Sequence, residues 1–291
     1  MDNKFYRKNE FKVVGTLVSA DVKLGNRKSD GAGYVVTTTV VKVDIAGQRP
    51  REFEITFKSN EKTVAGQPNK LYATYSSLPN LVNKKVEISG ELSESRFWSD
   101  NSGQIISAQK LQGKWVKGVL PTAVDESSFA IGGFVVRELQ EKLDKNKNIY
   151  RYDLMLGQET YAGSNKLQMI TLHVDPTAAE VVRGVKNYQA GQTVMVTGSL
   201  VWYTEMVTRE EDSAFGKITK TYPNTYKNCF IEAGSNPVKP EEGAFDAATI
   251  SSLIEAYKAN DAVLMQGAEE KGNDQPVVNA APVTKRQTSL I

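Results

Sequence analysis

An arginine followed by two large aromatic side chains, Arg96, Phe97 and Trp98, stands directly before a run of turn-forming residues at 99–103. Water disfavours exposed aromatic rings, so rings at the end of a strand need a partner. Nucleic-acid bases stack on aromatic rings, and their phosphates pair with a nearby arginine or lysine. The stretch therefore predicts a contact with single-stranded nucleic acid. The alternative is that Trp98 folds back onto its own hairpin or onto another domain.

The side chains on which most enzymes and metal sites depend are scarce in this chain. His173 is the only histidine and Cys229 the only cysteine, whereas a zinc site needs three or four such ligands. The sequence contains neither a phosphate-binding glycine loop nor a dinucleotide-binding fingerprint. We therefore expect no enzyme activity, no metal and no cofactor. A metal-dependent nuclease that uses the carboxylates at 210–212 remains an alternative.

The composition is that of a soluble globular protein with an uneven distribution of charge. The 291 residues carry a net charge of +2. Five basic and eight acidic side chains follow residue 234, so that segment carries −3 and the first 234 residues carry +5. A mildly basic body permits a polyanionic partner. No apolar run approaches the ~20 residues of a membrane helix, and the polar N-terminus and lone cysteine lead us to expect a cytoplasmic location.

The strand patterns that would position these candidate residues occur twice in the chain. Three short patterns recur in the same order at offsets of 118, 115 and 108 residues. The matching ranges are 11–18 with 129–136, 54–60 with 169–175, and 85–92 with 193–200. Offsets that shrink gradually indicate two copies of one fold that differ by short loop deletions.

Each copy reads as three strands, a short helical or irregular piece and two further strands. Five strands with a helix between the third and fourth is the order of an OB-fold barrel, whose strand face and loops bind oligonucleotides. Glycines in the middle of predicted strands, such as Gly15, Gly90, Gly133 and Gly198, are typical of the sharp bends that close a small barrel. The predicted fold class is all-β with minor helix, built as two tandem OB-fold barrels.

The domain organisation follows from the repeat. We predict a first barrel over 1–116, a linker over 117–127, a second barrel over 128–234 and a flexible tail over 235–291. Within the tail, the pattern over 246–260 predicts one short helix with Asp246 as its N-cap. A lone short helix is marginal in water, so we expect it to dock on the barrels or on a partner protein. The alternative is that the acidic tail lies weakly on the basic body as an electrostatic lid.

Two stretches resemble a known family. Residues 84–104, KKVEISGELSESRFWSDNSGQ, resemble the fourth strand and following hairpin of bacterial-type single-stranded DNA-binding proteins. Residues 179–200 resemble the helix and fourth strand of the same family. This chain has one extra residue between Gly90 and Trp98, so either Phe97 or Trp98 can take the family's stacking position.

The resemblance implies a divergent, viral two-barrel member that binds single-stranded DNA with little sequence preference during replication or recombination. Its implied partners are single-stranded DNA and, through the tail, replication or recombination proteins. The alternative is a non-catalytic structural or assembly protein that uses OB barrels for protein contacts, because a fold does not fix a function.

Further candidate contacts combine aromatic rings with cations at strand ends or on hairpins. In the first copy they are Tyr34, Arg49, Arg51 and Phe53. In the second copy they are Tyr150, Arg151, Tyr152, Lys166, Trp202, Tyr203, Lys217 and Lys220. Strand alternation places Trp202 toward the core and Tyr203 outside. We expect Trp115, at the end of the first barrel, to pack at the junction between the domains.

Overall fold

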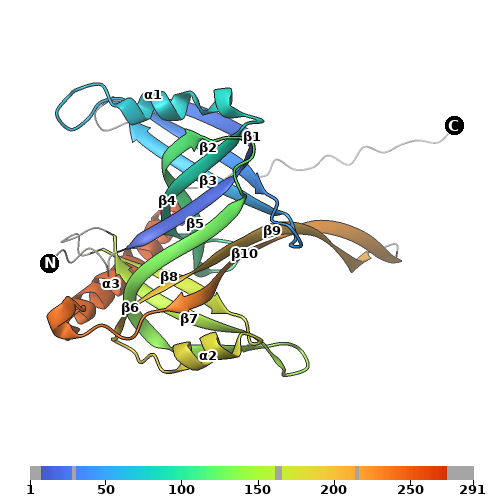
Figure 1. Cartoon of the computed structure of the whole chain (residues 1–291), viewed down its shortest axis with the longest axis vertical. Coiled ribbons are helices and arrows are strands. Elements are labelled where there is room, and N and C mark those ends of the chain that lie inside the picture. Colours follow the sequence, from blue (N-terminus) through green and yellow to red (C-terminus); the bar gives the residue numbers. More distant parts are fainter. Residues whose placement is uncertain (1–7, 28–30, 161–165, 214–215, 274–291) are drawn as a thin grey trace, which may run out of the picture.

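The computed structural model describes residues 8–27, 31–160, 166–213 and 216–273 (Figure 1). The first half of the chain contains β1 (Asn9–Asn26), β2 (Gly33–Val43), β3 (Arg51–Asn60), α1 (Lys70–Ser76), the 3-10 turn η2 (Leu78–Leu81), β4 (Lys85–Ser99) and β5 (Gln104–Gly118). The second half contains β6 (Glu126–Leu143), β7 (Ile149–Glu159), β8 (Leu167–Val174), α2 (Ala179–Lys186), β9 (Thr193–Ser213) and β10 (Gly216–Gly234). The chain continues with η3 (Pro240–Glu242) and α3 (Ala247–Asn273).

Each half closes into a five-stranded barrel of the OB type. In the first barrel, β1 pairs antiparallel with β2 and β4, and a parallel contact between β3 and β5 closes the barrel at Ile55 and Leu111. In the second, β6 pairs with β7 and β9, and β8 meets β10 in parallel at His173 and Phe230. The predicted fold class, all-β with two tandem OB barrels, is confirmed. The division into independent domains stays a prediction.

One mid-strand glycine bends the fourth strand of each barrel, Gly90 in β4 and Gly198 in β9. A β-carbon at Gly90 would collide with the carbonyl oxygen of Gln112, and one at Gly198 would collide with that of Phe230. The pairing of β4 with β5 also shifts register beside Gly90, and that of β9 with β10 shifts just beyond Ile231. Such bulges bend a strand, and they allow a small barrel to close.

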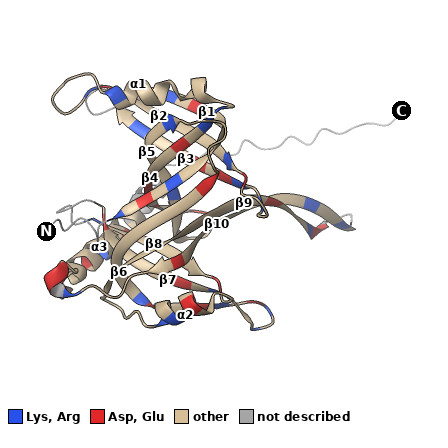
Figure 2. Cartoon of the chain, viewed as in Figure 1, with Lys and Arg blue, Asp and Glu red and all other residues tan. Residues whose placement is uncertain are grey.

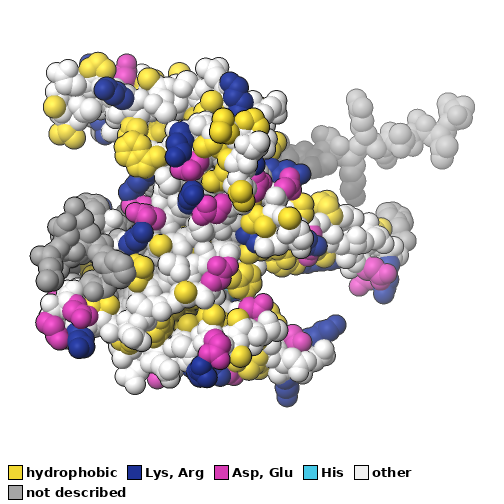
Figure 3. Space-filling view, in the orientation of Figure 1, with side chains coloured by type: hydrophobic (Ala, Val, Ile, Leu, Met, Phe, Trp, Pro, Cys, Tyr) yellow, Lys and Arg dark blue, Asp and Glu magenta, His cyan; other side chains and the backbone are white. Residues whose placement is uncertain are grey.

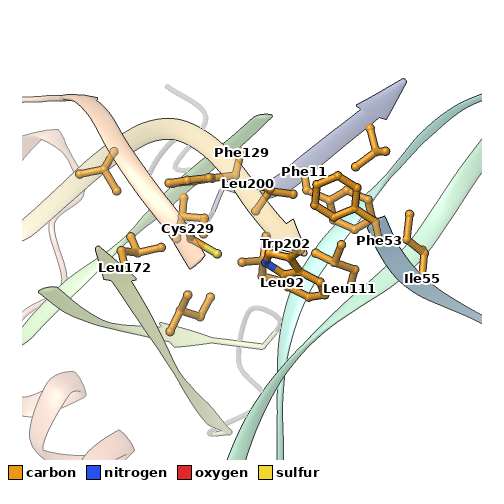
Figure 4. Close-up of a cluster of buried hydrophobic side chains, with 14 of the residues drawn as sticks. Phe11, Phe53, Ile55, Leu92, Leu111, Phe129, Leu172, Leu200, Trp202 and Cys229 are labelled. Atoms are coloured by element: carbon orange, nitrogen blue, oxygen red, sulfur yellow. The ribbon is translucent and has the colours of Figure 1, made fainter. Parts of the chain in front are cut away.

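The two barrels share one sheet and one core. β1 and β6 pair antiparallel from Asn9–Ile131 to Val14–Glu126, which joins all ten described strands into a continuous sheet. Apolar side chains of both halves form one cluster, in which the Phe53 and Trp202 rings lie 5.9 Å apart (Figure 4). The barrels are therefore joined by backbone hydrogen bonds and by buried apolar contacts.

Buried polar groups fix the strand register on both sides of this joint, and the Asn9 amide also donates across it to Gln158 Oε1 at 2.8 Å. The Asn9 amide donates to the carbonyl oxygen of Leu92 at 2.7 Å and accepts from the Leu92 backbone N–H at 2.9 Å. At the corresponding position of the second barrel, the Ser127 hydroxyl donates to the carbonyl oxygen of Leu200 at 2.9 Å. Because an unpaired buried polar group is costly, these bonds disfavour any slipped register.

The predicted tail helix is longer than expected and packs on the barrels. It begins after Asp246, whose carboxylate accepts from the Thr249 backbone N–H at 2.8 Å, and it runs to Asn273 rather than ending near 260. Leu253 is buried with Phe134 and Leu167 of the second barrel. The expectation of a docked helix is therefore met, and that of a short helix is wrong. No helix within the described residues is long and apolar enough to cross a membrane.

Candidate nucleic-acid interface

The β9–β10 hairpin extends well beyond the second barrel (Figure 1). The projecting part, called the arm below, comprises residues 203–213 of β9 and 216–226 of β10, which pair from Tyr203–Tyr226 to Ser213–Gly216. Threonine, tyrosine and valine, which favour extended backbone, recur along both strands, and Gly216 stands beside the turn. A long two-stranded arm with both faces in solvent is an element that a ligand can lie against.

Strand alternation gathers the tyrosines of the arm on one face. Residues paired directly across two antiparallel strands lie on the same side of the sheet. Tyr203 pairs with Tyr226, Val207 with Tyr222, and Arg209 with Lys220. One face of the arm, called the tyrosine face, therefore carries three aromatic rings and two cations, namely Tyr203, Tyr222, Tyr226, Arg209 and Lys220.

At the end of the arm nearest the barrels, planar side chains of the tyrosine face stack in a column. The Tyr203 and Tyr226 rings are stacked, with centroids 4.9 Å apart and planes 22° from parallel. The Arg49 guanidinium, from the first barrel, lies 4.5 Å from the Tyr203 centroid and pairs with Glu205 at 2.9 Å. The column thus places a cation of one barrel against the aromatic rings of the other. Further out, Tyr222 is 37% exposed.

Hydrogen bonds set the charge states along this face. The phenol of Tyr226, and then the guanidinium of Arg49, lower the pKa of Glu205, and the same contact with Glu205 raises the pKa of Tyr226. Further along, hydrogen bonds from Lys220 and Tyr222 lower the pKa of Glu211. At neutral pH the carboxylates are therefore ionised and the phenols protonated. A phosphate that approaches Arg49 or Lys220 must replace a carboxylate.

The opposite face of the arm differs in kind. It carries a row of threonines, at positions 204, 208, 219, 221 and 225. The hydroxyls of Thr204 and Thr225 lie 2.9 Å apart. Lys217 is on this face and pairs with Glu210 at 3.4 Å, so the two lysines predicted on the arm, Lys217 and Lys220, lie on opposite sides. A base can stack on the tyrosine face, whereas the described residues of the other face include no aromatic ring.

The hairpin between β4 and β5 carries the sequence motif that first suggested a site. Its side chains alternate between two faces, with Phe97 46% exposed on one and Arg96 and Trp98 half-buried on the other. The Arg96 side chain is covered by α3, with its guanidinium 3.6 Å from the Tyr257 ring centroid and paired with Asp261. The motif is therefore split into an open side and a covered side.

Four predicted contact residues are buried, and their assignment to a surface site is wrong. Phe53, Trp202 and Tyr152 belong to the shared core. The Phe53 and Trp202 rings pack across the two barrels, and Tyr152 is covered by the Lys186 ammonium of α2. Arg51 donates to the Ser127 hydroxyl at 2.6 Å and to the Leu200 carbonyl at 2.8 Å. Arg51 therefore holds the two barrels together.

The other candidates lie on separate elements. Tyr150 is 53% exposed at the start of β7, with the Arg151 guanidinium 5.5 Å from its ring centroid. Arg151 also pairs with Asp153 at 2.8 Å. Tyr34 is half-buried at the start of β2, and Lys166 is exposed directly before β8. None of these four residues lies on the arm.

Three aromatic residues at the surface were missed as candidates, of which Tyr222 and Trp115 are exposed and Tyr226 is half-buried. Tyr222 and Tyr226 could have been found from the alternation in KTYPNTY, residues 220–226, once that segment was identified as a strand. Trp115 was expected to pack at the junction, but it is 67% exposed. It lines a groove of about 880 Å³ that also includes Lys12 and Lys114. Ser128 and Phe129 of β6 line the same groove, so Trp115 lies beside the junction, but the expectation that it packs there is wrong because its ring stays exposed.

The charges of the surface are mixed rather than segregated. Along the strands in Figure 2, basic and acidic side chains alternate, and the same mixture covers the face shown in Figure 3. Lys12 pairs with Glu126 at 2.7 Å and Lys117 with Glu87 at 2.8 Å. Within the described residues, no group of three or more His, Cys, Asp and Glu side chains could hold a metal ion.

Two barrels with OB topology, joined through their first strands and bearing an aromatic arm, define a tandem OB-fold protein. The model of the YorF family matches residues 8–269, and the chain belongs to that family.

Solved structures provide a second comparison. The wild-type single-stranded DNA binding protein from Thermus aquaticus is 11% identical, with a TM-score of 0.49, and the match covers 79% of this chain and 93% of that one. A deletion mutant of the same protein is 12% identical with the same TM-score, and the match covers 79% and 95%. A search of curated proteins gave no match.

Proposed function

We propose that this protein binds single-stranded DNA, largely without sequence preference, and performs no chemistry on it. The observation that carries the proposal is the tyrosine face, where Tyr203, Tyr222 and Tyr226 stand on one side of a solvent-exposed arm. Every base has a flat aromatic surface, so stacking on such rings tolerates any sequence. Bases are available for this stacking only when the nucleic acid is single-stranded.

The cations beside the rings fit the same ligand. Arg49, Arg209 and Lys220 lie on or next to the tyrosine face, within reach of a backbone whose bases stack there. Arg49 and Lys220 are paired with carboxylates, so the electrostatic contribution is modest. Three phosphate contacts predict that the logarithm of the association constant falls with that of the salt concentration with a slope of about −2.

A role in replication or recombination and a viral source belong to the same proposal. They rest on the resemblance of residues 84–104 to single-stranded DNA-binding proteins. The choice of DNA over RNA rests on it too. A contact of the tail with replication or recombination proteins likewise stays a prediction.

The test compares two double variants of the arm. Tyr222→Ala with Tyr226→Ala removes two rings from the tyrosine face, and Thr221→Ala with Thr225→Ala changes the threonine face by the same number of residues. Binding of a fluorescent oligo-dT strand is measured by anisotropy over a salt series. Each lost stack should weaken binding about 5- to 100-fold, whereas the threonine variant should bind as the unmodified protein does.

Oligo-U and duplex DNA serve as competitors, and circular dichroism checks that both variants are folded. Equal binding by the two folded variants would remove the tyrosine face from the site. If the unmodified protein binds no single strand even at low salt, the alternative of a non-catalytic assembly protein is favoured. The paired charges of the arm and the exposed Trp115 would suit such a protein.

A further inference from the structure

The middle of α3, at Tyr257 and Asp261, covers the Arg96 side of the β4–β5 hairpin. Helix α3 contacts β4, β5 and β8 (Figure 1). The Arg96 guanidinium lies against the Tyr257 ring, pairs with Asp261 and donates to the Tyr257 carbonyl oxygen at 3.3 Å. As a result, only 11% of the Arg96 side chain is exposed. A cation at the end of a hairpin has thus been enclosed by a segment of its own chain.

The contacts that α3 makes with Arg96 are those that a nucleotide would make. Asp261 supplies an anionic oxygen where a phosphate oxygen would pair with the guanidinium. The Tyr257 ring supplies a flat π surface over the same guanidinium, as a base does when it stacks on arginine. Strand alternation places Trp98 on the same face as Arg96, two residues further out. The covered face therefore combines a cation with an aromatic ring.

Both barrels contribute polar groups to the hydrogen-bond network around the Tyr257 hydroxyl. The Tyr257 hydroxyl donates to Glu94 Oε1 at 2.6 Å, and only 3% of the Glu94 side chain is exposed. Glu94 also accepts from the Ser107 hydroxyl at 2.7 Å and from the Met169 backbone N–H at 2.8 Å. Burial, and then the bond to Glu94, raise the pKa of Tyr257, so the phenol stays a donor at neutral pH.

The first turns of α3 and its middle are held against the barrels by different kinds of contact. Its beginning is anchored in apolar contacts, where Leu253 packs with Phe134 and Leu167, and Phe245 meets the edge of Phe134 with ring centroids 5.5 Å apart. Its middle is held through Tyr257 and Asp261. Tyr257 packs at the edge of the same apolar cluster, but its hydroxyl and the Asp261 carboxylate make polar contacts that another polar ligand can replace. The helix can therefore uncover Arg96 while its first turns remain docked.

The equivalent hairpin of the second barrel is uncovered. By the sequence repeat, Leu92 corresponds to Leu200, so the covered face of β4–β5 corresponds to the threonine face of the arm. In the arm, positions Thr204 and Thr225 are exposed. The cation and the helix that covers it occur in one barrel only, so the cover is specific to the Arg96 face.

We propose that the Arg96 face of the β4–β5 hairpin is a second contact surface for the phosphate backbone of a single strand, and that α3 occupies it in cis and competes with that strand. The inference rests on the proposed function and adds to it a site and its regulation. The occupant that displaces Asp261 is a phosphodiester.

The test releases the middle of α3 without deleting the helix. Tyr257→Ala with Asp261→Ala removes the contacts to Arg96, and the anchor at Leu253 remains. Affinity for oligo-dT at low salt should rise about three- to five-fold, because one partly exposed ion pair no longer competes. Adding Arg96→Gln to this variant should abolish the gain. Glu255→Ala removes a negative charge from the exposed side of α3 and should change affinity by less than about two-fold.

A measurement on the unmodified protein complements the variants. Hydrogen exchange of the backbone amides at 255–265 should become faster when saturating oligo-dT is added, whereas amides at 248–254 should keep their protection. Slower or unchanged exchange at 255–265 on binding would overturn the proposal. So would a folded release variant that binds no more tightly than the unmodified protein.

The outcomes separate this inference from the proposed function. If the tyrosine-face variant loses affinity and the release variant gains none, the arm binds DNA and the cis competition is wrong. If neither the unmodified protein nor the release variant binds a single strand at low salt, the proposed function fails, and this inference with it.

Discussion

Phe11 and Phe129 lie directly opposite each other in the β1–β6 pair, and they are also the same position of the sequence repeat, because the offset between the first strands is 118 residues. In an antiparallel pair, a residue can face its own equivalent only if a two-fold relation passes between them. The pairs on either side, Asn9 with Ile131 and Val13 with Ser127, obey the same relation. The joint therefore has the geometry of a symmetric dimer made within one chain.

The first prediction concerns Arg51, which is buried in this joint. Arg51→Ala should lower the free energy of unfolding by about 1–3 kcal/mol, because it removes charge-assisted hydrogen bonds to Ser127 and Leu200. Urea unfolding followed by circular dichroism measures the change. Arg49→Ala is the matched control, since Arg49 is exposed and should affect DNA binding rather than stability. Equal urea midpoints for the Arg51→Ala variant and the unmodified protein would contradict the role given to Arg51.

The second prediction concerns cooperativity between the barrels. Trp202 of the second barrel packs on Phe53 of the first. Trp202→Ala should cost about 3–5 kcal/mol through lost burial and the cavity left behind. The cavity would weaken both barrels, so calorimetry should show one unfolding transition that moves to lower temperature as a unit. Two transitions, of which only one moves, would show that the barrels unfold separately.

The third prediction is a pH dependence that arises at Asp153. Burial tends to raise the pKa of this carboxyl, but the hydrogen bond with His173 and the charges of Arg151 and Lys142 outweigh burial and lower it. A lowered folded-state pKa means that the stabilisation is complete above the ordinary pKa of aspartate, about 3.9. It is lost as the pH falls through the folded-state value.

Asp153→Asn tests this assignment. The variant should be less stable than the unmodified protein near pH 6, and the difference should shrink as the pH is lowered below about 4. Unfolding free energies from urea titrations at several pH values measure the difference. A difference that stays constant down to pH 2 would assign the acid sensitivity to other carboxylates.

The fourth prediction concerns the thiol of Cys229. Full burial raises its pKa to about 12, and the reactive form of a cysteine is the thiolate. The native protein should therefore react with a thiol reagent only when it opens, whereas the urea-unfolded chain should react at once. The rate of labelling over time measures this contrast. Rapid labelling of the folded protein would show that the packing around Cys229 opens readily.

The barrels could be predicted because their signals are local. Period-two alternation of Phe53, Ile55 and Phe57 marks a strand, and mid-strand glycines mark bends, whatever lies beyond the strand. The order of strands and helix in each repeat then indicates the OB topology. The long α3 was underestimated because its apolar stripe weakens after Tyr257, although polar contacts to Arg96 hold its middle.

The site was harder to predict because burial depends on elements far away in the sequence. Arg51 and Arg49 are two residues apart, yet one is enclosed by β6 and β9 while the other lies open beside Tyr203. Likewise, Arg96 and Phe97 are neighbours, and only a helix more than 150 residues later decides which one is covered. A single sequence carries no pattern that places one barrel, or α3, on the other.

The antiparallel joint between β1 and β6 also bears on the direction in which a bound nucleic-acid strand would run. A two-fold relation reverses every path that runs in the plane of the joined sheet, and a DNA strand has a chemical polarity from 5′ to 3′. A strand that follows the first barrel in one sense thus meets the corresponding surface of the second barrel in the opposite sense. To use both surfaces in the same sense, a continuous strand must make a U-turn between them, so chain reversal is the route that this architecture suits.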